Sequence, residues 1–246
     1  MPERFLSSEE YDEQAHQLYN DGDYEGALEM LKEGLALYPN AVDLYVGMGY
    51  ARLAREEYAW ARTAFERATA LDHGHEDALV GLGETLLRFG EHERAIRLFR
   101  QVESMGFEDD MELMLTMGRA LYREELFTDA RDIFARAAAA RPDSPEAAAS
   151  LGYALHRLGD ETGATRQIRR ALRLDPDLHE ARIYLGHLLY DRGDWENSLR
   201  EFERVPPPEH WDALAVWRLI ELKRVLWRLE DDDARLHPLK GRLEDL

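Results

Sequence analysis

The chain has 246 residues, of which 45% are hydrophobic and 33% are charged, and its formal net charge at pH 7 is −19. The hydrophobic content excludes general disorder, the complete lack of Cys excludes disulfides and thiolate metal sites, and the negative charge argues against a nucleic-acid partner because phosphates would be repelled. The opening residues, MPERFLSSEE, resemble neither a signal peptide nor a membrane span. We therefore expect a cytoplasmic protein without a membrane-spanning segment.

From residue 8 onward, one skeleton recurs with a period of 34 or 35 residues. A Gly marks the middle of the first segment of five copies, at Gly49, Gly83, Gly118, Gly152 and Gly186. A small residue follows twelve positions later, and a large apolar residue follows four positions after that. The six small and large pairs are Ala27 and Leu31, Ala61 and Phe65, Ala95 and Phe99, Ala130 and Phe134, Ala164 and Ile168, and Ser198 and Phe202.

Each copy predicts two antiparallel helices. A Gly inside a helix costs about 1 kcal/mol relative to Ala, so a recurring Gly needs a packing reason. We expect it to bring the first helix close to the small residue of the second helix, while the large residue fills the space where the two helices separate. Gly22, Gly90, Gly159 and Gly193 fall between the helices, where a left-handed residue ends a helix.

This skeleton resembles the tetratricopeptide repeat, which combines Leu-Gly, Tyr, Ala, Phe and a closing Pro over 34 residues. The resemblance implies an all-α fold: an α-solenoid of six helix pairs that forms a right-handed superhelix, with the first helices on the concave face. The predicted organisation is an N-terminal extension at 1–7, six repeats over 8–209, and a C-terminal capping helix and tail at 210–246. The repeats are assigned to 8–41, 42–75, 76–110, 111–144, 145–178 and 179–209.

The segment after Pro206-Pro207-Pro208 predicts one long helix near 211–229 that is apolar on two sides. One side covers the last repeat, because solenoid ends need a cap. The second side needs another cover. We expect the tail, RLHPLKGRLEDL, to fold back over it, and a second protein is the alternative.

No catalytic constellation is present, so we expect no enzyme activity and no cofactor. The sequence lacks a Gly-x-Ser-x-Gly elbow and a phosphate-binding loop. His73 and His75 in DHGHED are a candidate metal pair. Polar residues also gather in turns for purely structural reasons, and we prefer that interpretation.

The resemblance implies a protein-binding groove on the first helices. The predicted partner-binding residues are His16, Tyr19, Tyr50, Glu84, Arg119, Tyr122, Arg123, Tyr153, His156, Arg157, His187 and Tyr190. Within this set we expect repeats four and five to form one aromatic and cationic patch for an acidic side chain or a C-terminal carboxylate. The alternative is that each Tyr packs between neighbouring helices.

The predicted function is therefore a scaffold or adaptor that binds an extended peptide or a helix of another protein. The alternative is a structural scaffold that assembles with itself through the solenoid ends or the apolar C-terminal helix. Residues 1–41 carry ten acids against Arg4 and Lys32, which suggests either solubility or a basic partner at this end. We prefer solubility.

Overall fold

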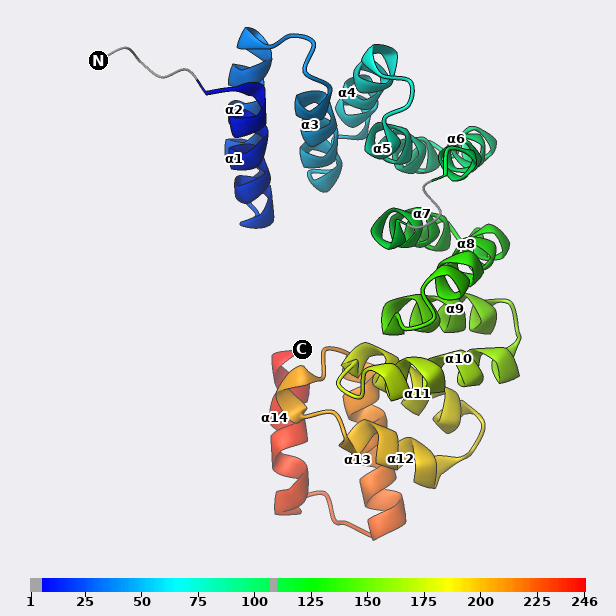
Figure 1. Ribbon diagram of the computed structural model, residues 1–246. Coiled ribbons are helices and arrows are strands. Elements are labelled where there is room, and N and C mark those ends of the chain that lie inside the picture. Colours follow the sequence, from blue (N-terminus) through cyan, green and yellow to red (C-terminus); the bar gives the residue numbers. More distant parts are fainter. Residues whose placement is uncertain (1–5, 107–109) are drawn as a thin grey trace. The chain divides into compact units, whose positions relative to one another are not determined.

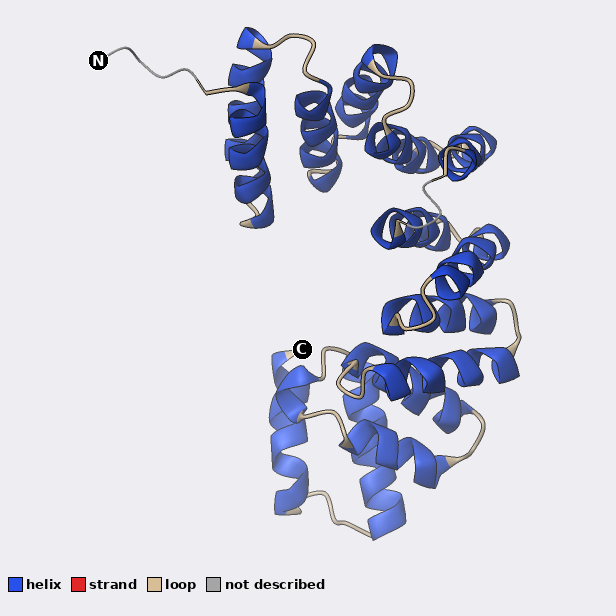
Figure 2. Cartoon of the chain, viewed as in Figure 1, coloured by secondary structure: helices blue, strands red, loops and turns tan. Residues whose placement is uncertain are grey.

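The computed structural model describes residues 6–106 and 110–246, and within these ranges the regular elements are helices (Figure 1). Figure 2 shows the same chain without strands in the described ranges. The all-α fold class is thus confirmed. In chain order, the helices up to residue 203 are α1 (Ser8–Asn20), α2 (Tyr24–Leu37), α3 (Val42–Ala54), α4 (Tyr58–Leu71), α5 (Glu76–Arg88), α6 (His92–Ser104), α7 (Met111–Arg123), α8 (Phe127–Ala140), α9 (Pro145–Arg157), α10 (Glu161–Leu174), α11 (His179–Asp191) and α12 (Trp195–Glu203).

The chain divides into two compact units, Met1–Leu126 and Phe127–Leu246. The N-terminal unit holds α1 to α7, and the C-terminal unit holds α8 to α12 together with α13 (Ala213–Trp227) and α14 (His237–Asp245). The division falls between α7 and α8, inside the predicted fourth repeat. Within each unit, the second helix of one pair packs against the first helix of the next, as α2 does on α3 and α10 on α11.

The turns between paired helices use left-handed backbone. Gly22, Gly90, Gly159 and Gly193 have φ between +72° and +83°, as the sequence predicts. Glu56 stands 34 residues after Gly22, and Glu125 stands 35 residues after Gly90, so each Glu occupies the repeat position of a turn Gly. Both Glu residues have φ of 59°. A non-Gly residue adopts this conformation at a cost, so repeats two and four carry strained turns that no Gly marks in the sequence.

Gly49, Gly83, Gly152 and Gly186 each pack against the large residue of their repeat. The expected approach to the small residue is also present, because a Cβ at Gly152 would lie 3.2 Å from the Ala164 carbonyl and the Ser198 hydroxyl donates to the carbonyl of Gly186 at 2.8 Å. A Cβ at Gly49 would lie 2.5 Å from Cε1 of Phe65, and a Cβ at Gly83 would lie 2.4 Å from Cε1 of Phe99. Phe65 also reaches the next repeat, because a Cβ at Gly81 would lie 2.3 Å from its ring. These distances leave no room for a methyl group, so the fully buried rings take the space that the missing side chains leave.

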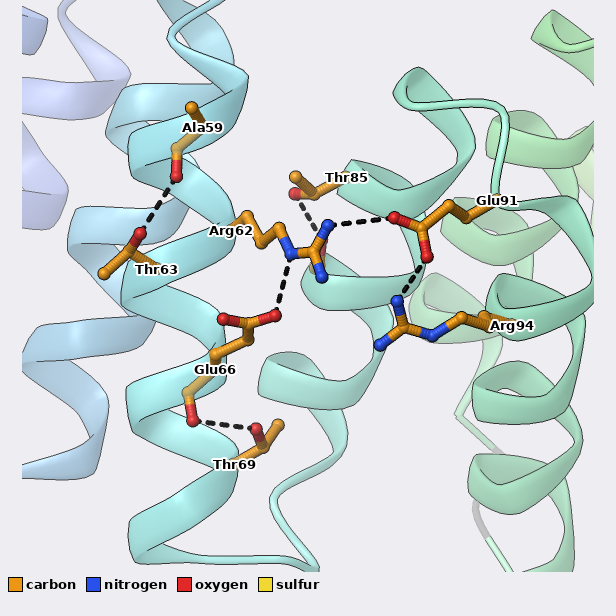
Figure 3. Close-up of polar contacts among 9 residues, drawn as sticks. Ala59, Arg62, Thr63, Glu66, Thr69, Thr85, Glu91 and Arg94 are labelled. Atoms are coloured by element: carbon orange, nitrogen blue, oxygen red, sulfur yellow. Dashed lines mark hydrogen bonds and ion pairs between the residues drawn. The ribbon is translucent and has the colours of Figure 1, made fainter.

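Charged side chains also join neighbouring repeats. In Figure 3, Arg62 of α4 reaches Glu66 on its own helix at 2.7 Å and Glu91, which precedes α6, at 2.9 Å. Arg94 of α6 binds the second oxygen of Glu91. The hydrogen bond from Arg94 is the main reason that the pKa of the Glu91 carboxyl is lowered. Exposed pairs of this kind contribute little individually and more as a network.

The C-terminal tail folds back as predicted. It forms a second helix, α14, that packs against α13. Leu239 of α14 joins Leu219 and Leu222 of α13 in one core with Phe202 of α12. The other side of α13 is only partly covered, because Trp217 and Trp227 are 50% and 41% exposed. No helix in the described ranges is both long and apolar enough to cross a bilayer.

Candidate functional site

A hollow of 480 Å³ opens in the N-terminal unit among the first helices α1, α3, α5 and α7. This volume lies in the range of ligand pockets. Its apolar floor includes Ala15, Leu31 and Val46, and its wall carries Tyr19 and Tyr50. Stacking of the repeats therefore places side chains from four first helices, far apart in sequence, around one space.

Five carboxylates surround this hollow, and the described residues that line it include no Lys or Arg. They are Asp12, Asp43, Asp77, Asp110 and Glu112. Burial raises the pKa of the Asp12 carboxyl, and the negative charge of Asp43 raises it further. Burial also raises the pKa of Asp77, an effect that His75 opposes and that the negative charges of Glu76, Asp110 and Glu112 strengthen. The hollow is thus rich in carboxylates, and the basic side chains in its lining are the histidines His16 and His75.

Two side chains of the wall are held in place by hydrogen bonds within the unit. Nδ1 of His75 accepts from the N–H of Ala78 at 3.4 Å, and its Nε2 lies 3.0 Å from Oδ1 of Asp43. The hydroxyl of Tyr50 donates to the backbone carbonyl of Asp77 at 3.2 Å. Both residues link α3 to the start of α5, so the wall is built before any ligand arrives.

Three predicted partner-binding residues, His16, Tyr19 and Tyr50, lie in the wall of this hollow. Two others interact elsewhere in the unit, since Arg123 of α7 donates to the carboxylate of Glu84 on α5. Glu84 is only 8% exposed, so this ion pair satisfies a nearly buried charge. Arg119 is exposed on α7, and Tyr122 is half-buried beside it.

The predicted residues of the C-terminal unit contact neighbouring aromatic and charged groups. The ring of Tyr153 lies 4.5 Å from that of Tyr184, and Nδ1 of His156 lies 2.6 Å from the Tyr184 hydroxyl. The Arg157 guanidinium lies 4.2 Å from the centre of the Phe127 ring. Arg119, Tyr122 and Arg123 belong to the other unit, so their union with these residues in one patch stays a prediction.

His187 and Tyr190 are engaged by the chain's own α13. Nε2 of His187 lies 2.6 Å from Asp212, and the Tyr190 hydroxyl donates to Glu221. The Arg218 guanidinium lies 4.3 Å from the centre of the Tyr190 ring. The first helix of repeat six therefore uses these side chains to hold the capping helix, and we leave them out of the proposed binding site.

The candidate metal pair gains no support from its surroundings. In the ranges 6–106 and 110–246, no three His, Asp or Glu side chains gather as metal ligands would. His75 uses both ring nitrogens in the cap and in the Asp43 contact, while His73 is exposed in the turn. The DHGHED segment leads into α5, and His75 caps the N-terminus of that helix.

The predicted partner-binding residues do not include the five carboxylates of the hollow. Asp43, Asp77 and Glu112 occupy one register position in three successive repeats, so a common location could be inferred from the period. Acids in the first turn of a helix also stabilise its positive end. Their recurrence in the sequence therefore does not by itself indicate that they line a hollow. His75, at the last position of its predicted repeat, carried no sequence signal for the hollow.

Comparison with known proteins identifies the repeat. The tetratricopeptide repeat family matches residues 13–70, 46–106 and 115–179, together well over half of the chain. No curated protein matches the sequence.

Solved structures share the fold over much of the chain at low identity. PilW, described as a widely conserved type IV pilus biogenesis factor, is 13% identical with a TM-score of 0.66, over 96% of this chain and 98% of that one. The pilF protein of Pseudomonas aeruginosa is 16% identical with a TM-score of 0.63, over 81% and 96% of the two chains. YrrB, described as a TPR protein with an unusual peptide-binding site, is 23% identical with a TM-score of 0.50, over 70% and 88%.

Proposed function

Because the chain belongs to the tetratricopeptide repeat family, we propose that it is a non-catalytic adaptor that binds a basic segment of another protein in the hollow of its N-terminal unit. The observation that carries the proposal is the set of five carboxylates without Lys or Arg in the same wall. A Lys or Arg side chain of the partner would supply the missing cation. The peptide-binding site named for YrrB is consistent with a peptide ligand on such a scaffold.

The form of the ligand follows from the shape and chemistry of the wall. The hollow has room for a few side chains, and its apolar floor with Tyr19 and Tyr50 favours an apolar residue or a cation against a ring face. The charged group would lie near Asp12 and Asp77, whose pKa values are raised in the unbound protein. A bound cation favours the ionised carboxylates, so affinity falls as the pH falls through those raised pKa values.

Selection of peptides from a random displayed library on the immobilised chain tests the proposal. We expect the selected peptides to be enriched in Lys and Arg. The variant Asp12→Asn/Asp77→Asn should bind them at least about tenfold more weakly, equivalent to about 1.4 kcal/mol. The matched control, Glu93→Gln/Glu180→Gln, removes the same charge from exposed positions outside the hollow and should bind as the wild type does. Enrichment in acidic or uncharged peptides, or equal binding by both variants, contradicts the proposal.

A further inference from the structure

The second helix of repeat five, α10, carries an exposed cationic face in an acidic protein. It contains four Arg and one Glu, although the whole chain has 50 acids against 31 bases. Arg166, Arg169 and Arg173 are exposed and line a shallow hollow of 390 Å³ together with Thr162 and Thr165. Positions spaced by three and four share one side of a helix. We call Arg166, Arg169 and Arg173 the arginine face.

The arginine face lacks ion pairs within its own chain. Arg192, at the edge of the same hollow, is neutralised by Glu161 at 2.9 Å. In contrast, no described Asp or Glu lies within ion-pair distance of the three Arg of the face. Arg94 of α6 is also exposed, and it meets the carboxylate of Glu91. Three unpaired guanidinium groups on one face form an anion-binding surface with forked donors.

A complementary surface lies on α2, the second helix of repeat one. Glu29 and Glu33 are exposed, one helical turn apart, and have no ion-pair partner among the described residues. Glu25 continues the same line and pairs with Arg55. Lys32 is the one basic side chain of α2. The spacing of Glu29 and Glu33 equals that of Arg169 and Arg173, so the two helices can meet through two charge pairs.

We propose that the arginine face of one copy binds the Glu29 and Glu33 side of α2 on a second copy. We assign a second copy of the chain as the partner because the same chain carries both of the complementary charged surfaces. Because the two surfaces differ, the contact is head-to-tail, and it leaves one free surface at each end for further copies. Exposed ion pairs are individually weak, so the contact is transient and sensitive to salt. This contact does not depend on the basic ligand of the N-terminal hollow.

Sedimentation of the untagged protein tests the contact through charge reversal. At about 50 mM salt, we expect the average mass of the wild type to rise with protein concentration, and at about 1 M salt, where screening is several times stronger, we expect it to stay constant. Arg169→Glu/Arg173→Glu and Glu29→Arg/Glu33→Arg should each associate at least about tenfold more weakly by themselves. An equimolar mixture of the two variants should associate again, because each supplies the surface that the other needs.

The control variant is Arg97→Glu/Arg100→Glu on α6, which changes the net charge as the α10 variant does and lies outside the arginine face. It should associate as the wild type does, and circular dichroism melts should show all variants folded. The proposal is overturned if the wild type stays monomeric at every concentration at low salt. It is also overturned if association survives high salt, if the control loses association equally, or if the mixture fails to recover it.

Discussion

The guanidinium of Arg218 on α13 donates a hydrogen bond to Nδ1 of His187 on α11 across 2.9 Å. A guanidinium only donates, so this nitrogen is an acceptor and the imidazole is neutral, with its proton on Nε2 toward Asp212. Burial is the main reason that the pKa of His187 is lowered from 6.5, the Asp212 hydrogen bond opposes this effect, and the charge of Arg218 adds to it. The capping helix is therefore held by a histidine that must stay unprotonated.

Acid should loosen the C-terminal unit before the carboxylates titrate. Burial lowers the pKa of His210 as well as that of His187. The unfolded chain binds a proton on each near pH 6.5 that the folded chain does not, so stability is complete above about pH 6.5 and decreases below it. We expect the melting temperature to be lower at about pH 5.5 than at about pH 7.5.

The Arg218→Met variant should raise the pKa of His187, as measured by NMR, because the repulsive charge is gone. Arg224→Met removes an exposed Arg of the same helix that pairs instead with Asp231, and it should leave that pKa unchanged. An unchanged His187 pKa in Arg218→Met would contradict the assigned hydrogen bond.

Gly81→Ala should destabilise the N-terminal unit by about 1–3 kcal/mol, the usual cost of overpacking. The new Cβ would lie 2.3 Å from the buried Phe65 ring. Gly74→Ala is the control, since its Cβ would meet nothing closer than 3.4 Å, and it should be neutral or slightly stabilising. Chemical denaturation measures both. Phe65→Leu combined with Gly81→Ala should cost less than the sum of the single changes, and additive costs would show that the two sites do not touch.

Arg123→Glu should destabilise the protein by about 1–3 kcal/mol, the cost of leaving a buried polar group unpaired. The pairing of Arg123 with the nearly buried Glu84 is the cause. The sequence alone suggests a harmless groove-surface change. Arg119→Glu, at an exposed position of the same helix, should shift the free energy of unfolding by less than about 0.5 kcal/mol. Equal thermal and denaturant midpoints for the two variants would rule out a structural role for Arg123.

Leu239→Ala should destabilise the C-terminal unit by about 2–5 kcal/mol, as large-to-small core changes do. Leu239 is 5% exposed in the core that α14 shares with α13, whereas Leu214 is 50% exposed. Leu214→Ala is the matched control and should be nearly neutral.

Removal of residues 230–246 should promote association by uncovering the core that α14 shares with α13. A truncated chain as stable and as monomeric as the whole protein would show that α14 contributes nothing.

The period of the sequence predicted most of the helices, because small and large residues recur where helix packing demands them. The repeat register also marks the turn positions that take left-handed backbone, even where the residue type at that position does not suggest it. Glu56 and Glu125 stand at the positions of Gly22 and Gly90, yet Glu alone does not suggest left-handed backbone. The pairing of Arg123 with Glu84 depends on how two helices are placed in space, and a one-dimensional pattern does not contain that placement.

The Phe65 ring has a consequence for the order of the repeats. It fits against Gly49 of its own repeat and against Gly81 of the next one. In repeat four, the residue that corresponds to Gly81 is Thr116. If repeat three were deleted, Thr116 would take the place of Gly81, and its side chain would run into the Phe65 ring. Repeat four therefore resembles repeat three in sequence but cannot take its place beside Phe65.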